Sequence, residues 1–252
     1  MPALRQRFGD AYPRIAAFPH DLVVRVHAGR GVDALDRETD HLGPPLLRRG
    51  ALRAARRLRL RLSAAARLHA AALLAGLRDL GENYAQEFAS KHADPTLVAL
   101  APRWHFIGAL QTNKARLVVG RALIHTVDRP ALVTALAARA RALACTQEIL
   151  IEVNLAGEAQ KAGVAPEALP ALLDAVAHEA GVLRCVGLTL IPPADADPER
   201  ARPHFAALRE LAARAGGGRP HVELRELSMG MSGDFAVAIA EGATLVRIGT
   251  AI

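Results

Sequence analysis

Short apolar runs rich in β-branched residues alternate with alanine-rich stretches of helical length over the last two thirds of the chain. This alternation is typical of βαβ units, in which helices connect parallel strands. Three expected helices have proline near their start or glycine at their end, as helix boundaries commonly do. They are residues 130–144, 166–179 and 197–215. The expected strands are residues 80–83, 105–110, 124–127, 148–154, 185–191, 227–231 and 245–250.

These seven strands need one more strand to close a barrel. Residues 58–62 alternate Leu and Arg with a period of two, which suits a strand, although the same letters also suit an arginine-rich helix. Eight parallel strands, each followed by a helix, form a TIM barrel, and 252 residues suit one such domain. The predicted fold class is therefore α/β, a single (β/α)8 TIM barrel over residues 58–252. Residues 1–57 form an atypical arginine-rich segment before it.

The positive charge of the chain lies in its first third. Residues 1–75 contain 14 arginines and six acidic residues, whereas residues 76–252 are almost neutral, so that the net charge is +7. The arginines alternate with Leu and Ala rather than with the aromatic residues that stack on bases. A coding sequence rich in G and C would give the same composition. Nucleic acid is therefore not the expected partner, but an RNA-binding segment remains an alternative.

Several other classes are excluded by what the sequence contains. No eighteen apolar residues follow one another, and the first residues lack the apolar core of a signal peptide, so we expect a cytoplasmic protein without a membrane partner. Cys145 and Cys185 are too few for a disulfide framework and suit small buried apolar residues. The ten histidines include no H-x-H or H-E-x-x-H pair, and therefore no metal site is expected.

Polar residues follow the expected strands at the end where a TIM barrel carries its chemistry. The loops after the last two strands read Ser-Met-Gly-Met-Ser from Ser228 and Arg-Ile-Gly-Thr from Arg247. Glycine lets a backbone approach an anion, hydroxyl groups donate hydrogen bonds, and arginine adds charge and paired donors. The sequence therefore predicts that these two loops bind the phosphate of a small ligand.

Seven strings also carry a family resemblance, in an order and spacing that extend from about residue 75 to the last residue. The strings are GENYAQE from Gly81, WHFIGALQTNK from Trp104, IHTVDR from Ile124, VNLAGEAQKAG from Val153, GLTLIPP from Gly187, LSMGMSGD from Leu227 and VRIGTAI from Val246. They resemble successive motifs of the YggS/PROSC family.

The resemblance implies a barrel similar to the N-terminal domain of alanine racemase. It also implies a protein that binds pyridoxal 5′-phosphate and carries or buffers it, with no established catalytic turnover. The expected partner is thus this small-molecule cofactor, and we expect a monomer. Arg247 would lie near the phosphate or the pyridine ring. The phosphate residues implied by the resemblance are Ser228, Gly230, Ser232, Gly249 and Thr250, and the residues implied to line the pocket are Asn83, His105 and Asn154.

His105 has a plainer interpretation, because a histidine in an apolar strand is commonly a core residue hydrogen-bonded inside the protein. An amino-acid racemase is the nearest enzyme alternative. Its chemistry needs a lysine base and a tyrosine base supplied by a second domain and a partner subunit, for which this chain has no room.

One departure from the family pattern affects the covalent anchor. The family has a Schiff-base lysine nineteen residues before the glycine of GENY, and the same count from Gly81 reaches Leu62. The chain contains only Lys91, Lys114 and Lys161, of which Lys161 follows the fifth expected strand and is either a surrogate anchor or an ordinary loop lysine. Either the first third has diverged or its reading frame is wrong. The rise in arginine content where the motifs stop favours the second explanation.

Overall fold

The strands form a closed barrel in which their order around the barrel follows the chain. The structure is a computed structural model that describes residues 22–25, 69–70, 72–74, 77–158 and 161–249. The strands are β1 (Leu22–Arg25), β2 (Asp79–Glu82), β3 (Arg103–Phe106), β4 (Leu123–Val127), β5 (Gln147–Glu152), β6 (Leu183–Thr189), β7 (Val222–Met231) and β8 (Leu245–Ile248). Strands β2 to β8 pair in parallel, as the alternation of strands and helices predicts.

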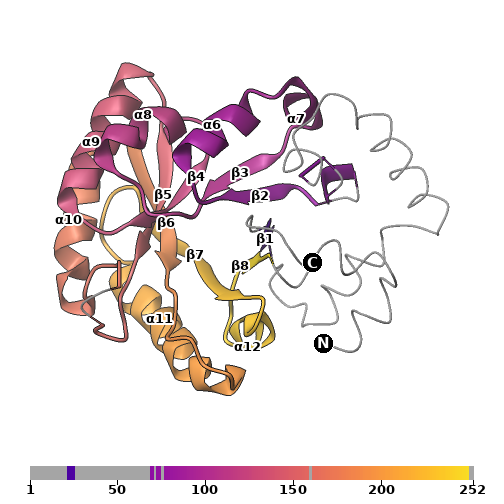
Figure 1. Ribbon diagram of the computed structural model, residues 1–252. Coiled ribbons are helices and arrows are strands. Elements are labelled where there is room, and N and C mark those ends of the chain that lie inside the picture. Colours follow the sequence, from indigo (N-terminus) through magenta and orange to yellow (C-terminus); the bar gives the residue numbers. More distant parts are fainter. Residues whose placement is uncertain (1–21, 26–68, 71, 75–76, 159–160, 250–252) are drawn as a thin grey trace, which may run out of the picture.

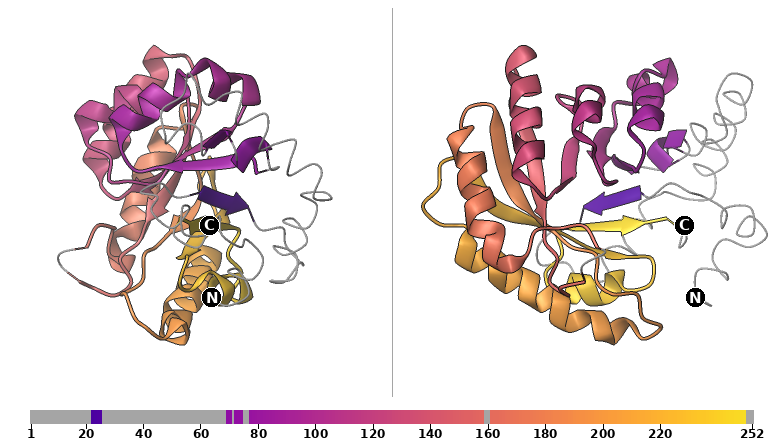
Figure 2. Two further views of the ribbon diagram at one scale, coloured as in Figure 1. Left: turned by 45° about the vertical axis from the view of Figure 1, so that its right-hand side comes forward. Right: turned by 60° about the vertical axis from the view of Figure 1, so that its left-hand side comes forward.

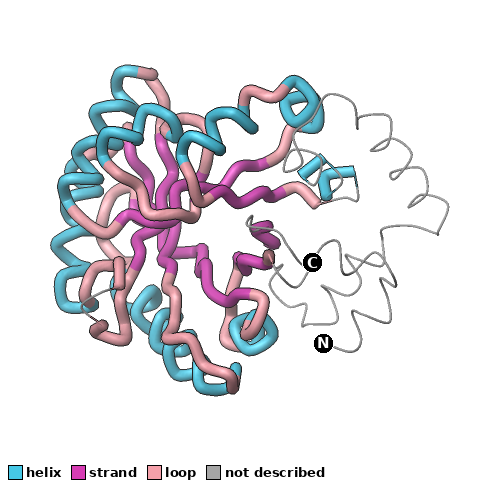
Figure 3. The backbone as a smooth tube through the Cα atoms, viewed as in Figure 1, coloured by secondary structure: helices cyan, strands magenta, loops and turns pink. Residues whose placement is uncertain are grey.

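Helices connect these parallel strands and lie outside them (Figures 1 and 3). The α-helices between β2 and β8 are α6 (Ala85–His92), α7 (Pro95–Leu100), α8 (Ala115–Val118), α9 (Pro130–Ala142), α10 (Leu169–His178), α11 (Arg202–Ala215) and α12 (Phe235–Ala240). Short 3-10 helices precede three of them, namely η2 (Thr112–Lys114), η3 (Pro166–Ala168) and η4 (Pro198–Ala201). The helices expected over 130–144, 166–179 and 197–215 are therefore confirmed, with proline in the first turn of each.

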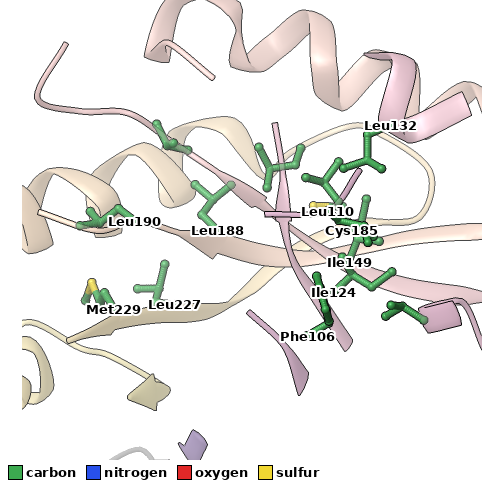
Figure 4. Packing of buried hydrophobic residues seen from close by; sticks show 14 of the residues in the cluster. Phe106, Leu110, Ile124, Leu132, Ile149, Cys185, Leu188, Leu190, Leu227 and Met229 are labelled. Carbon is green, nitrogen blue, oxygen red and sulfur yellow. The ribbon is translucent and has the colours of Figure 1, made fainter. Parts of the chain in front are cut away.

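The strands bury side chains on both faces, and the two faces differ in character. Alternate residues such as Ile149 and Ile151 pack outward against the helices in a large apolar cluster, whereas Leu150 between them packs inward with Val186 and Leu245. Figure 4 shows the outward layer, in which Leu132 of α9 lies over side chains of the neighbouring strands. Buried polar side chains occupy much of the remaining interior. The interior therefore has polar groups that need hydrogen-bond partners.

The barrel closes through β1, but this strand does not run in the expected direction. Leu22 pairs with Leu80 of β2 and with Ile248 of β8, and β1 is antiparallel to both (Figure 2). The prediction of eight parallel strands is thus corrected to seven parallel strands and one antiparallel strand. A run of β-branched residues can satisfy the two neighbouring backbones in either direction. Residues 58–62, the expected eighth strand, lie outside the described residues.

Candidate functional site

The carboxyl ends of β7 and β8 lie side by side and bring together most of the residues expected at the phosphate. The Ser232 Oγ accepts a hydrogen bond from the backbone N–H of Gly249 at 3.2 Å. Gly230 has φ +92°, and a Cβ there would lie 2.5 Å from the Cβ of Ala238 in α12, so glycine is required at this turn. We call residues 230–232 together with Gly249 the cradle. Thr250 lies outside the described residues.

Arg247 lies beneath the cradle as a buried cation. Its NH1 donates to the Ser228 Oγ at 2.8 Å, to the Ser228 carbonyl oxygen at 2.9 Å and to the Thr189 Oγ1 at 3.1 Å. Its NH2 donates to the carbonyl oxygen of Leu190 at 2.9 Å. The guanidinium therefore ties β8 to β7 and to the end of β6, and it places positive charge at this end of the barrel.

A buried carboxyl group lies near this cation. Burial raises the pKa of Glu152 in β5, the negative charge of Asp128 raises it further, and Arg247 partly opposes both effects. The net result is a raised pKa in a side chain that is only 6% exposed. Glu152 is thus a carboxyl group near Arg247 whose charged form is disfavoured by burial.

A continuous hydrogen-bonded chain crosses the barrel interior from β2 to β8, and we call it the polar relay. The Asp79 Oδ1 lies 3.0 Å from the His105 Nε2, and the His105 Nδ1 lies 2.9 Å from the His125 Nε2. The His125 Nδ1 lies 3.0 Å from the Ser228 Oγ, which contacts Arg247. All five side chains are buried. Both ring nitrogens of His105 therefore have partners inside the protein, as the plainer interpretation of this residue expects.

The Asp79 end of the relay is held by a second arginine. The Arg103 Nε and NH2 donate to the two carboxylate oxygens of Asp79 at 2.8 and 2.6 Å. Burial raises the pKa of Asp79, but the hydrogen bonds from His105 and Arg103 and the positive charge of Arg103 outweigh burial, and the net pKa is lowered. Asp79 is therefore a stable anion at the amino end of β2.

The two asparagines expected to line the pocket shape the loops at the strand ends. The Asn154 Nδ2 donates to the carbonyl oxygen of Glu158 at 2.9 Å and closes the loop after β5. The backbone of Asn83 passes Gly108 so closely that a Cβ on Gly108 would lie 1.9 Å from the Asn83 carbonyl oxygen. Both residues therefore lie in loops at the carboxyl ends of their strands, and a role in lining the pocket stays a prediction.

All three lysines of the chain lie within the described residues. Lys91 is buried on α6 and forms an ion pair with Glu82. The Nζ of Lys161 lies 2.8 Å from the Oε1 of Glu158 in the loop after β5, and Lys114 ends the 3-10 helix η2. Leu62, the position expected for the anchoring lysine, lies outside the described residues. Two of the three amines are thus paired with a nearby acid.

Sequence reasoning missed His125, Glu152 and Thr189 near the carboxyl ends of β7 and β8, and it missed Asp79 at the far end of the polar relay. One signal was available, because His105 and His125 each interrupt an apolar strand and the two strands follow one another along the chain. The hydrogen bond between His125 and Ser228 joins residues 103 positions apart, and the spacing of residues along the chain does not predict such a contact. In the described part of the chain, no group of three or more His, Cys, Asp or Glu residues could hold a metal ion.

A hollow of about 870 Å³ lies at the opposite mouth, around the amino ends of β3 to β7. Arg184 on its wall pairs with Glu148 and Glu223, which neutralises part of the wall. Chemistry in this fold is found at the carboxyl ends of the strands, and we therefore place the candidate site at the cradle. Among the described residues, no helix is both long and apolar enough to cross a bilayer.

Comparisons with known proteins agree with the barrel fold. Residues 63–252 match the family profile described as the alanine racemase N-terminal domain. The chain is similar to a pyridoxal phosphate homeostasis protein of Aquifex aeolicus, with 47% identity over 176 residues that cover 69% of this chain and 75% of that protein.

Two solved structures are also similar. PipY of Synechococcus elongatus, solved with PLP bound, has a TM-score of 0.67 and 35% identity, and the match covers 80% of this chain and 98% of PipY. An alanine racemase of Streptomyces coelicolor has a TM-score of 0.56 and 22% identity over 74% of this chain, which shows the fold alone. That match covers 49% of the racemase.

Proposed function

Because the chain belongs to the family of the pyridoxal phosphate homeostasis proteins, we propose that it binds pyridoxal 5′-phosphate (PLP) and serves as a carrier and buffer of this cofactor. The observation that carries the proposal is the cradle, in which the loops after β7 and β8 are joined through Ser232 and Gly249 above a buried arginine. The PLP bound to the similar PipY supports the same ligand here.

The residues of the cradle fit a phosphorylated ligand. Gly230 turns the backbone without a side chain, so that the chain can approach a phosphate closely. The Ser232 hydroxyl and, from the sequence, the Thr250 hydroxyl would bind the phosphate, and Arg247 would compensate its charge from below. We keep Asn83, His105 and Asn154 as proposed pocket residues. When bound, PLP supplies an aldehyde that reacts with amines.

We propose that capture is reversible and non-covalent. Leu62 stands where the family has its lysine, and Lys91 and Lys161 are paired with Glu82 and Glu158. An arginine does not replace a lysine in this role, because its guanidinium stays protonated. Racemase chemistry requires two bases, and the similarity to the racemase extends over only half of that enzyme. A carrier needs neither base.

The cradle is tested by comparing PLP with pyridoxal, which lacks the phosphate. We expect Ser232→Ala and Thr250→Ala each to weaken PLP binding by roughly tenfold, because a hydrogen bond to a charged group contributes about 1.5 kcal/mol or more. Pyridoxal binding should change little. Isothermal titration measures both dissociation constants, and Ser90→Ala on the exposed side of α6 is the matched control. Equal losses for the two ligands would place the phosphate elsewhere.

We further propose a cytoplasmic monomer whose partner is the cofactor and that has no nucleic-acid partner. Cys145 and Cys185 are free thiols, which suits a reducing compartment. The arginine excess lies in residues 1–75, most of which are outside the described residues. Titration of RNA into the full chain at two salt concentrations tests the last point, since saturable binding that falls with salt would contradict it.

A further inference from the structure

The chemistry of its two ends gives the polar relay one direction. An arginine only donates hydrogen bonds, so the Ser228 Oγ accepts from Arg247. The Ser228 hydroxyl can donate its single hydrogen to its other partner, the Nδ1 of His125, or accept a second hydrogen bond there. At the opposite end a carboxylate only accepts, and Asp79 therefore accepts from the His105 Nε2.

The two histidines have to be consistent with both ends. For neutral rings, Asp79 sets the direction: His105 carries its hydrogen on Nε2 and donates it to Asp79, so its Nδ1 accepts from the His125 Nε2. The His125 Nδ1 then has no hydrogen and accepts from Ser228. Two neutral rings with the hydrogen on Nε2 satisfy every bond in the relay. This direction also suits Arg247, because Ser228 then donates to His125 and accepts from the guanidinium.

We infer that His125, His105 and Asp79 are positioning residues of the cofactor site, which act through Ser228 on Arg247. By accepting the Ser228 hydrogen, His125 turns a lone pair of Ser228 toward the guanidinium and fixes the orientation of the cation beneath the cradle. The Ser228 hydroxyl hydrogen points into the barrel, and the residue therefore affects the phosphate through Arg247. This inference rests on the proposed function.

The residues of the relay are buried, so the loss of one hydrogen bond has a large energetic effect. Ser228 is fully buried and Arg247 is 5% exposed, so water does not replace a lost partner cheaply. Asp79 is also buried, and Arg103 fixes it from the opposite side with two hydrogen bonds. The relay therefore links a fixed anion at the amino end of β2 to a fixed cation near the carboxyl end of β8.

Binding by variants of His125 provides the first test. His125→Phe keeps an aromatic ring but removes both hydrogen-bonding nitrogens, and we expect PLP binding to weaken roughly tenfold with a much smaller change for pyridoxal. His125→Gln keeps an acceptor and a donor, and it should recover part of the loss. His178→Phe on the exposed end of α10 is the matched control. A purely structural role would weaken both ligands alike and would show no recovery by Gln.

The route through Arg247 is tested by a double-mutant cycle. If His125 acts through Arg247, His125→Phe adds little to the loss already caused by Arg247→Lys, whereas independent effects multiply. Wild-type protein that does not bind PLP would overturn the proposed function. Wild-type protein that binds PLP selectively, together with a His125→Phe variant that matches the control, would overturn this inference alone.

A third measurement observes the relay in the wild-type protein itself. In ¹⁵N-histidine-labelled protein, two-dimensional NMR reports which ring nitrogen carries the hydrogen, and the His125→Gln spectrum assigns one of the signals. We expect His105 and His125 each to carry the ring hydrogen on Nε2, as the direction of the relay requires. A hydrogen on the Nδ1 of either ring would reverse the relay and overturn the inference.

Discussion

Glu152 is a buried carboxyl group whose ionised form is disfavoured by burial and by Asp128. Because its pKa is raised in the folded state, the folded protein binds a proton more tightly than the unfolded chain. This group therefore lowers stability progressively as the pH rises from its unfolded pKa, about 4.3, through its folded pKa. Its cost is fully present at pH above that window.

We expect Glu152→Gln to remove this cost. The melting temperature of the variant should exceed that of the wild type at pH 8 by about 2–4 °C, which corresponds to about 1 kcal/mol for a chain of this size. The difference should shrink as the pH falls toward 4. Calorimetry across this pH range measures it, and Glu167→Gln at an exposed position is the control. A difference independent of pH would contradict the raised pKa.

Single residues in and beneath the cradle could be predicted because they follow from a rule about strand ends. Ser228, Ser232 and Arg247 stand at the end of the barrel where this fold binds ligands, and their hydroxyl and guanidinium groups suit phosphate. Asp79 and His125 have no such signal. Each acquires its role from a partner on another strand, and hydrogen bonds between strands depend on register, which the letters of one strand do not specify.

At the scale of elements, the contact between β6 and β7 depends on a glycine. A Cβ on Gly187 would lie 1.9 Å from the backbone carbonyl oxygen of Glu226, at the point where the register of the two strands shifts. Two residues further along, Thr189 and Ser228 are paired and both contact Arg247. The distance between β6 and β7 therefore determines where Thr189 and Ser228 accept hydrogen bonds from Arg247.

We expect Gly187→Ala to destabilise the protein by about 1–3 kcal/mol, because backbone cannot move aside as a flexible side chain can. PLP binding should weaken as well, since the Arg247 acceptors would shift. Urea unfolding gives the stability and titration gives the affinity. Gly217→Ala is the matched control, because a Cβ on Gly217 would meet nothing within 4 Å. Equal stability of the two variants would show that the strands separate at little cost.

The parallel elements could be predicted well from periodicity, whereas the closing strand could not. Seven expected strands overlap β2 to β8, although β7 begins five residues earlier than expected, at Val222. Exposed residues such as Glu223 interrupt the apolar pattern at that end. The antiparallel β1 has only four residues and no neighbouring helix pattern, so nothing local indicates its direction or its partners.

At the scale of the whole molecule, the small number of lysines makes covalent capture testable in one experiment. Borohydride makes permanent any bond between PLP and a lysine amine, and peptide mass mapping then locates it. We expect no specific labelling of Lys91, Lys114 or Lys161, because two of these amines are paired with acids and none belongs to the cradle. Specific labelling of Lys161 would identify it as a surrogate anchor.

Leu62→Lys is the positive control for this mapping. It restores a lysine at the spacing that the family resemblance indicates, and we expect specific labelling at residue 62. Labelling at 62 would place this residue beside the bound cofactor, as the family spacing predicts, and its absence would contradict that spacing. The control needs no change to the cradle.

The overall architecture could thus be predicted, because seven ordered strand-and-helix units leave few alternatives to a barrel. The first third could not be predicted in the same way. Its arginine-rich residues suit a strand and a helix equally. The alternation of strands and helices that identifies the other strands does not predict the direction of β1.

The His125–Ser228 hydrogen bond joins residues that are 103 positions apart. Local segments form early in folding, whereas a contact of such long range has to wait until the chain between its ends is arranged. The cofactor site therefore forms only when His125 and Ser228 have come together. By mass action, a ligand that occupies the site favours this late and complete state over every partly folded one. The available cofactor would thereby act as a folding aid for the protein that buffers it.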